Sequence, residues 1–202
     1  MARGFNEQEK QKIHQTLMEE GKVLFSRFGL KKTSINELAK AAGIAPGSFY
    51  TFFNSKEELF FEIIEREEKT IKNEFMNFDL NMAQHPKQAM KKLLLQTFIM
   101  IEENALFSQL LFEKNFDALL RRLPKEKLEA HFKKDSDTVA LVASKWKKMG
   151  IVREIEEDVL AGLFRALFTM SLHKKEIGEG VYPKALKLLV DFIVEGLVSK
   201  EE

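Results

Sequence analysis

The stretch Thr33–Phe60, TSINELAKAAGIAPGSFYTFFNSKEELF, contains the start and stop signals of two short helices. Ser34 and Glu37 form a Ser-x-x-Glu capping box, which predicts a helix that begins there and ends at the following glycine. Pro46 suits the first position of a second helix, because its missing N–H would have no intrahelical partner at that position. Two short helices joined by a tight, glycine-containing turn predict a helix-turn-helix over about residues 34–53.

Four aromatic rings fall within five positions of the predicted second helix. On a helical wheel, Phe49, Phe52 and Phe53 lie within about 100° of one another, which predicts a core face. Tyr50 points to the opposite side; the alternative is a half-buried Tyr50 packed on the next helix. The other outward residues are small or carry hydroxyls: Pro46, Gly47, Ser48 and Thr51. In a helix-turn-helix the second helix enters the major groove of DNA, and small outward residues allow that close approach.

The charges near these helices favour a polyanionic partner. Residues 1–56 hold nine basic and five acidic side chains, a net charge of +4, although the whole chain carries only +1. Ser34 and Lys56 lie at the N-termini of two predicted helices, where free N–H groups suit phosphate oxygens. A lysine at that position is unfavourable for the dipole of its own helix, so Lys56 also indicates an anionic partner.

Outside this stretch the apolar residues keep a helical period, and no segment alternates long enough to predict a sheet. The chain is therefore predicted to be all-α, with about nine helices. Ser55 with Glu58 forms a second capping box, which begins a long helix. The predicted helices cover residues 7–28, 34–42, 46–53, 55–78, 86–103, 105–123, 125–149, 154–177 and 182–200.

The composition excludes several classes of protein. The 202 residues include no cysteine, which excludes disulfides, thiolate zinc sites and cysteine nucleophiles. No apolar run approaches the roughly 18 residues that a membrane span needs, and the polar N-terminal residues do not form a secretory signal. We therefore expect a cytoplasmic protein that has no membrane partner.

At these residues the chain resembles the N-terminal DNA-binding segment of the TetR family of bacterial transcriptional regulators, over roughly residues 10–62. The positions that match the family pattern in register are Thr33, Ser34, Ala39, Gly43, Gly47, Tyr50, Phe53, Lys56 and Leu59. The resemblance implies contacts with DNA, mostly with its backbone, by Ser34, Ser48, Tyr50, Thr51 and Lys56. Three positions depart from the pattern: Ala45 replaces the usual Ser/Thr cap, Pro46 a frequent lysine or arginine, and Thr51 a common histidine or tyrosine. The loss of a cap and of a phosphate-binding charge predicts modest affinity.

The resemblance also implies a layout and a function. Residues 1–54 would form the helix-turn-helix DNA-binding domain, and residues 55–202 a helical effector-binding and dimerisation domain. We expect a homodimeric regulator, most simply a repressor, that binds double-stranded operator DNA and is released by an apolar or amphipathic small molecule. Activation in place of repression stays open. No cofactor, metal site or catalytic residue is expected.

Aromatic side chains of the predicted C-terminal domain suit either simple core packing or the lining of an apolar pocket. The pocket candidates are Phe98, Phe107, Phe112, Phe116, Phe164 and Phe168. Dimerisation is expected through the last two long helices, roughly residues 156–176 and 183–199, because two half-sites on DNA match a two-fold protein. The last helix carries an apolar stripe of Leu186, Leu189, Phe192, Ile193 and Leu197, and Ala166 and Gly196 permit close approach.

Two other classes of protein compete with this interpretation. An enzyme would have to use the four histidines, His14, His85, His131 and His173, but none lies in a His-Glu-x-x-His zinc motif. The sequence also has no Gly-x-Ser-x-Gly and no glycine-rich phosphate loop. The second alternative is a helical interaction module without DNA binding, yet such a module has no need for a small-residue face directly ahead of Lys56.

Overall fold

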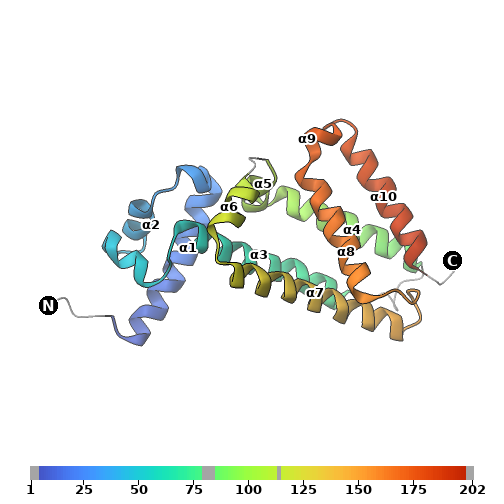
Figure 1. Ribbon diagram of the computed structural model, residues 1–202, viewed down its shortest axis with the longest axis horizontal. Helices are drawn as coiled ribbons and strands as arrows, with labels where there is room; N and C mark the ends of the chain where they lie inside the picture. The colour runs from blue at the N-terminus through green and yellow to red at the C-terminus, as the bar shows by residue number, and fades with distance from the viewer. Residues whose placement is uncertain (1–4, 79–84, 113–114, 199–202) are drawn as a thin grey trace. The chain divides into compact units, whose positions relative to one another are not determined.

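The computed structural model describes residues 5–78, 85–112 and 115–198, and these form ten α-helices and one 3₁₀ helix, η1 (Figure 1). In chain order the elements are α1 (Glu7–Lys32), α2 (Ile35–Ala41), η1 (Pro46–Thr51), α3 (Lys56–Asn77), α4 (Pro86–Glu103), α5 (Ala105–Phe112), α6 (Asn115–Arg122), α7 (Lys125–Lys148), α8 (Glu157–Leu172), α9 (Lys174–Ile177) and α10 (Tyr182–Leu197). Within these residues the only strand-like pairing is one antiparallel bridge between Val152 and Val198. The all-α prediction is confirmed. None of the described helices is long and apolar enough to cross a membrane.

The helices outnumber the nine predicted because two predicted helices are each divided. The segment 105–123 forms α5 and α6, and the segment 154–177 forms α8 and α9. The second division lies at His173, whose backbone angles (φ −113°, ψ 30°) leave the helical region. Periodicity could not reveal these breaks, since apolar residues continue on both sides of each.

The third predicted helix is a 3₁₀ helix instead of an α-helix. Its hydrogen bonds join residues three apart: the N–H of Ser48 donates to the carbonyl of Ala45, and that of Phe52 to the carbonyl of Phe49, each at 2.9 Å. A 3₁₀ helix has three residues per turn, so side chains three apart lie one above the other. This geometry decides which residues of η1 share a face.

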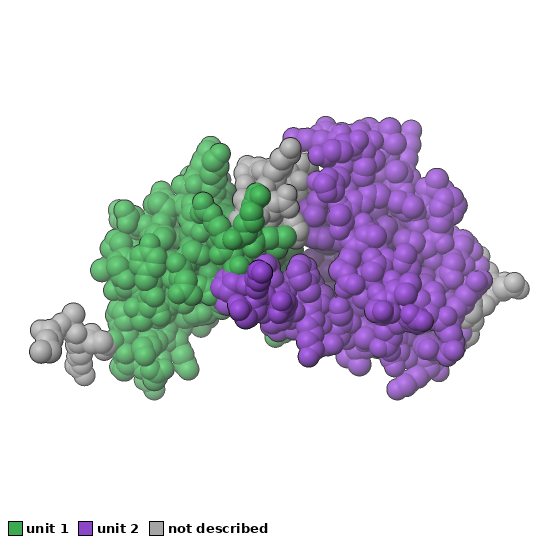
Figure 2. All heavy atoms as spheres, in the orientation of Figure 1, with its two compact units in different colours: residues 1–69, 104–123 green, residues 70–103, 124–202 purple. Residues whose placement is uncertain are grey.

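The chain forms two compact units (Figure 2). Unit 1 comprises residues 1–69 and 104–123, and unit 2 comprises residues 70–103 and 124–202. Helices α5 and α6 therefore group with the N-terminal helices, and the division falls within α3. The predicted domain boundary between residues 54 and 55 stays a prediction about function, and it differs from this division of the packing.

The core of unit 1 lies between α1 and α3, which pack closely at Gly21. A Cβ atom at this glycine would lie 3.0 Å from Cδ1 of Ile63 and 3.2 Å from Cδ2 of Leu59, so a larger residue would require these side chains to shift by a few tenths of an ångström. Phe25 of α1 and Phe60 of α3 meet edge to face, with ring centroids 5.2 Å apart. Fully buried side chains of the unit include Leu17, Phe25, Leu38, Phe49, Leu59, Phe60 and Ile63.

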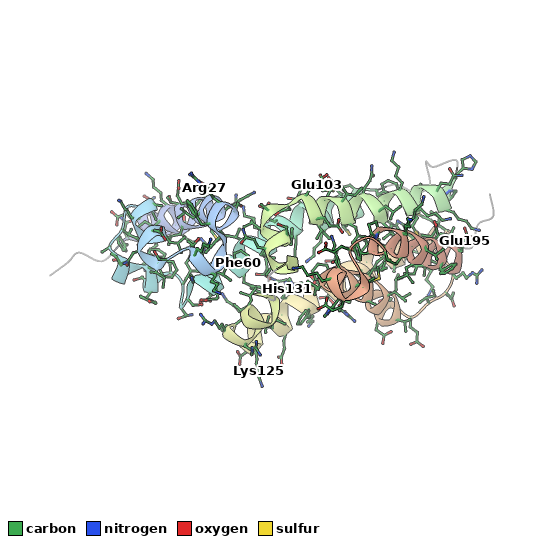
Figure 3. The ribbon with its side chains drawn as sticks, turned by 90° about the horizontal axis from the view of Figure 1, so that it is seen from above. Arg27, Phe60, Glu103, Lys125, His131 and Glu195 are labelled. Carbon is green, nitrogen blue, oxygen red and sulfur yellow. The ribbon has the colours of Figure 1, made fainter. Side chains whose placement is uncertain are left out.

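The core of unit 2 is built from α4, α7, α8 and α10 around the buried Trp146. Its buried members include Met90, Leu94, Phe98, Val142, Trp146, Leu167, Leu186, Val190 and Val194. On the surface, Glu195 of α10 (labelled in Figure 3) accepts from Lys87 at 2.8 Å and from Lys91 at 3.1 Å, both on α4. These charged contacts cross from α4 to α10 above the apolar core.

Candidate nucleic-acid interface

The helix-turn-helix begins with the predicted capping box at the start of α2. The Ser34 hydroxyl donates to Oε2 of Glu37 at 2.7 Å and accepts from the Glu37 N–H at 3.3 Å, and the same carboxylate oxygen accepts from the Ser34 N–H at 2.8 Å. The hydrogen bonds from Ser34 are the main cause that lowers the pKa of the Glu37 carboxyl. Ser34 is exposed, but its hydroxyl proton is already donated to the Glu37 carboxylate.

Two glycines of this region have different reasons to be glycine. Gly43, in the turn between α2 and η1, has a φ of +69°, a region that side chains with a Cβ rarely adopt. Gly47 has no such backbone angle, and a Cβ placed on it would meet no atom within 4 Å. The fold therefore requires Gly43 but does not require Gly47. The absence of a side chain at Gly47 leaves the backbone of η1 open to close approach from outside.

Two of the four aromatic rings anchor η1 fully, and one points outward. Phe49 and Phe53 are buried, and the half-buried Phe52 lies against Phe5, with ring centroids 5.9 Å apart. Tyr50 is 59% exposed, and its ring meets Phe49 edge to face. The predicted core face is confirmed, and the alternative of a half-buried Tyr50 is wrong.

The other residues on the outward face of η1 have small side chains, as the sequence indicated. Pro46, Gly47 and Thr51 are exposed and Ser48 is half-buried. Ala45, the N-cap residue, makes no side-chain hydrogen bond, as its departure from the family pattern implied. No residue of η1 carries a charge. The face presents hydroxyls, a phenol and bare backbone.

Lys56 has a different environment from the one that sequence reasoning proposed. Its ammonium donates to the carbonyl oxygens of Leu30 and Thr33, each at 2.7 Å, and of Lys31 at 3.2 Å. These acceptors are backbone atoms 23 to 26 residues upstream, so no side-chain pattern could have revealed them. The predicted contact of Lys56 with a DNA phosphate stays a prediction, and the structure directs its ammonium to the end of α1.

Two further polar contacts of unit 1, the Glu57–Arg122 pair and the bond from Asn54 to Glu58, were not predicted from the sequence. Glu57 is buried and pairs with Arg122 of α6 at 2.6 Å. At the second capping box, the Glu58 N–H donates to the Ser55 hydroxyl at 3.1 Å, and the Glu58 carboxylate accepts from the backbone N–H of Asn54 at 2.8 Å. The sequence signals of this arrangement were the Ser55–Glu58 spacing and the two adjacent acids that follow Lys56.

The phenylalanines predicted for an effector pocket divide between the two units. In unit 2, Phe98 lies in the core, and Phe164 and Phe168 are half-buried. In unit 1, Phe107 is buried. The side chains of the other two, Phe112 and Phe116, lie outside the described residues. Their role as a pocket stays a prediction, and Phe98 also satisfies the core-packing alternative.

The residues predicted for a dimer interface are exposed on α8 and α10. Phe192 is 62% exposed, Leu189 is 40% exposed, and Ala166 and Gly196 are exposed as well. The predicted apolar stripe of α10 is not continuous on the surface: Leu186 and Leu197 are buried in the core of unit 2, and Ile193 is half-buried. The 3.6-residue period places these residues on the inner side of α10.

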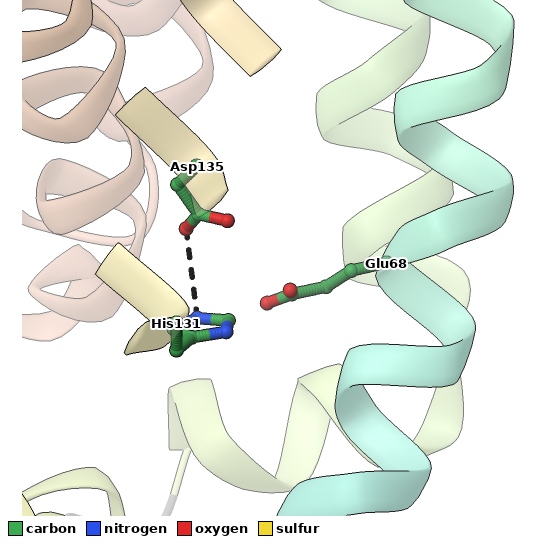
Figure 4. Close-up of side chains that lie close together, drawn as sticks. All are labelled: Glu68, His131 and Asp135. Atoms are coloured by element: carbon green, nitrogen blue, oxygen red, sulfur yellow. Dashed lines mark ion pairs between the residues drawn. The ribbon is translucent and has the colours of Figure 1, made fainter. Parts of the chain in front are cut away.

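The histidines lie apart from one another, and three of them face a carboxylate. His14 of α1 contacts Glu62 of α3 at 3.1 Å. His131 is buried on α7, and its Nε2 lies 3.5 Å from Asp135 one turn later (Figure 4). His173 is exposed and faces a glutamate, the surface contact that its spacing suggests. His85 is exposed at the start of α4.

Comparison with known proteins identifies the N-terminal part of the chain most directly. Residues 17–63 match the family described as bacterial regulatory proteins, tetR family. The HTH-type transcriptional regulator AcrR of Shigella flexneri is 31% identical over 110 residues, which cover 53% of this chain and 51% of that protein. The chain thus spans about half the length of this relative.

Solved structures share the fold over nearly the whole chain. A TetR-family transcriptional regulator from Pectobacterium atrosepticum superposes with a TM-score of 0.75 at 15% identity, covering 98% of this chain and 100% of that one. SmeT, the repressor of the Stenotrophomonas maltophilia multidrug efflux pump SmeDEF, gives a TM-score of 0.60 at 18% identity, covering 93% and 91%. SmeT is also known in complex with triclosan, with a TM-score of 0.56. At these identities the structures establish the fold alone. Residues 17–63 therefore resemble the tetR family of bacterial regulatory proteins, and the chain as a whole shares the fold of solved TetR-family regulators.

Proposed function

We propose that this protein binds double-stranded operator DNA by placing the outward face of η1 in the major groove. The observation that carries the proposal is the contrast between neighbouring rings: Phe49 is fully buried, whereas Tyr50 is 59% exposed beside residues without bulk. An exposed phenol offers both an apolar ring and a hydroxyl, which suit a duplex surface of bases and phosphates. The open backbone at Gly47 supports the same reading.

Contacts with the DNA backbone dominate this binding, and direct base contacts are few. The η1 segment lacks Arg, Lys, Asn and Gln, the side chains that form paired hydrogen bonds with purine edges. Pro46, Tyr50 and Thr51 can contact thymine methyl groups. The remaining specificity comes from sequence-dependent shape and stiffness of the duplex.

The active species in this proposal is a homodimer, formed through α8 and α10. A single helix-turn-helix contacts only one half-site, and a two-fold dimer presents two. Exposed Leu189 and Phe192 supply an apolar surface, and Ala166 and Gly196 leave room for a partner helix.

Sedimentation tests the dimer directly. The protein, whose chain has a mass of 23.4 kDa, should sediment as a dimer at micromolar concentration. The double variant Ala166→Glu with Gly196→Lys should sediment as a monomer, because it places charges on an apolar interface. A monomeric wild-type protein, or an unaffected double variant, contradicts the assignment.

The regulator acts as a repressor in the cytoplasm, and an apolar or amphipathic small molecule held by residues 86–177 releases it from the operator. The Phe and Met side chains of this region suit an adaptable apolar pocket. The SmeT repressor and its triclosan complex support such a ligand by similarity of fold. Linkage requires that operator DNA weaken ligand binding by the same factor by which the ligand weakens operator binding.

The effector is sought by thermal stabilisation with fatty acids, aromatic acids and cationic dyes. Each hit is then titrated into the complex of protein and operator. A true effector lowers operator affinity, and its own affinity falls equally when operator is bound. A ligand that binds tightly but leaves operator affinity unchanged is not the effector. A response to metal ions or polar metabolites alone contradicts the apolar pocket.

A further inference from the structure

Lys56 stands where its charge opposes the dipole of its own helix. It is the first residue of α3, whose free N–H groups carry a partial positive charge. Acidic residues are the favourable choice at such a position, and Glu57 and Glu58 follow directly. A lysine there needs a compensating acceptor elsewhere, and the structure contains that acceptor.

The acceptor is the carboxyl end of α1 and the link that follows it. The last carbonyls of a helix have no partner within the helix and carry a partial negative charge. The Lys56 ammonium reaches three carbonyl oxygens there, those of Leu30, Lys31 and Thr33. An ammonium has three N–H donors, so these contacts can use all of them. A phosphate contact would require Lys56 to give up at least one.

The position of these carbonyls follows from Gly29 and Thr33. Gly29 has a φ of +82°, which interrupts α1 and redirects its last turn. Thr33 is buried and satisfies the Gly29 carbonyl with both its N–H, at 3.1 Å, and its hydroxyl, at 2.8 Å. The carbonyl oxygens of Leu30 and Lys31, which follow Gly29, accept from Lys56 instead. Only Thr33 and Ser34 separate α1 from α2, so a contact with this link fixes the start of α2.

We propose that Lys56 is a positioning residue, whose ammonium clamps the link between α1 and α2 and thereby sets the orientation of α2, instead of binding a DNA phosphate. The effect on operator recognition rests on the proposed function, because the orientation of α2 matters only if the helix-turn-helix binds DNA. The clamp itself is a property of the free protein and can be tested without DNA.

The chain has no cysteine, so a single introduced cysteine can be modified chemically without reaction at another thiol. Lys56→Cys is unfolded in urea and alkylated with 2-bromoethylamine: the thiolate displaces bromide, and the new side chain carries an ammonium at the reach of lysine. Alkylation with 2-bromoethanol gives a side chain of equal length that ends in a neutral hydroxyl. Both products are then refolded, so the stability of the cysteine variant does not matter. Lys40→Cys, at an exposed lysine of α2, is treated identically as the control.

Without DNA, the ammonium product at position 56 should melt near the wild-type temperature. The hydroxyl product should melt lower by roughly 4 °C or more, and its amides from Ser34 to Glu37 should exchange hydrogen faster. The two products at position 40 should melt at similar temperatures. Equal melting of the two products at position 56 overturns the clamp, whatever the protein does with DNA.

With a duplex selected by the wild-type protein, binding is measured at low temperature, where every product is folded. The hydroxyl product should lose roughly tenfold of its preference for that duplex over random DNA, with an unchanged dependence of log K on log salt. The ammonium product should regain the preference. A phosphate contact predicts the opposite: equal loss on both DNAs and a slope that flattens by about 0.9 per lysine. That result overturns the proposal.

Discussion

Units 1 and 2 are both helical, and each contains ion pairs as well as side chains that bond to the backbone, such as the Glu57–Arg122 pair in unit 1 and the bond from Lys145 to the Met76 carbonyl in unit 2. They differ at the short helices of the helix-turn-helix, whose ends are bonded by side chains. In unit 1, Ser34 and Lys56 bond to helix ends, and Gln109 of α5 donates to the backbone carbonyl of Phe25 at 2.6 Å. In unit 2, charged side chains bond to one another across helices, as Lys91 does with Glu195 and Lys174 with Glu102. Bonds to the backbone fix the angle of a short helix, whereas an ion pair joins two flexible side chains and holds the backbone less directly. Such bonds suit the proposed role of unit 1, which is to present a fixed surface to a duplex.

Removal of the buried ring tests the packing side of this comparison and should have the largest effect. Phe49→Ala removes a fully buried side chain from η1, which packs against α2, and leaves a cavity there. We expect a loss of about 3–5 kcal/mol of unfolding free energy, measured by urea unfolding. A loss below 1 kcal/mol would contradict the burial of this ring in solution.

Removal of the neighbouring exposed ring should separate DNA binding from stability. Tyr50→Ala should change the unfolding free energy by less than about 0.5 kcal/mol. Its affinity for operator should fall by roughly 30-fold, at about 1 kcal/mol for each of two half-sites, in a fluorescence anisotropy titration. Phe132→Ala removes another exposed ring, on α7 of unit 2, and should leave operator affinity unchanged. Equal losses from the two variants would remove the special role of η1.

The two neighbouring rings also show which features of the structure could be predicted from the sequence. The wheel assigned Phe49 and Tyr50 correctly because their roles follow from positions within one short segment. The capping box of Ser34 with Glu37 was predictable for the same reason, since both partners lie within one helical turn. The acceptors of Lys56 were not predictable, because they are backbone atoms of another helix and depend on the redirected chain at Gly29. The packing of α5 against α1 was likewise not predictable, because it joins residues far apart in sequence, such as Gln109 and Phe25.

The smallest expected effect concerns two carboxylates: that of Glu37, which accepts hydrogen bonds from a neighbouring residue, and that of Glu195, which pairs with lysines of another helix. Hydrogen bonds from Ser34 lower the pKa of Glu37, and Lys87 followed by Lys91 lower the pKa of Glu195, each from an ordinary value of 4.5. Each carboxylate therefore adds stability that is present above pH 4.5 and is lost as the pH falls through its lowered pKa. Salt screens charge pairs far more than hydrogen bonds between neighbouring groups.

NMR titration of these two carboxyl groups at low salt and in 1 M NaCl measures the difference. The pKa of Glu195 should rise toward its ordinary value in high salt, and the pKa of Glu37 should move less. Glu195→Gln should make the melting temperature less dependent on pH near 4. Equal salt shifts for Glu37 and Glu195 would show that these two carboxylates do not differ in this way in solution.

The central claim is that the outward face of η1 binds duplex DNA as part of a two-fold dimer. Selection from a random duplex pool, followed by a salt titration of the enriched duplex, tests this claim most directly. We predict an enriched site with two inverted half-sites whose centres lie about one helical turn, or a multiple of it, apart. Its affinity should fall steeply as the salt concentration rises, because phosphate contacts dominate. Failure of the wild-type protein to enrich any sequence, or an enriched site without two-fold symmetry, would contradict the account.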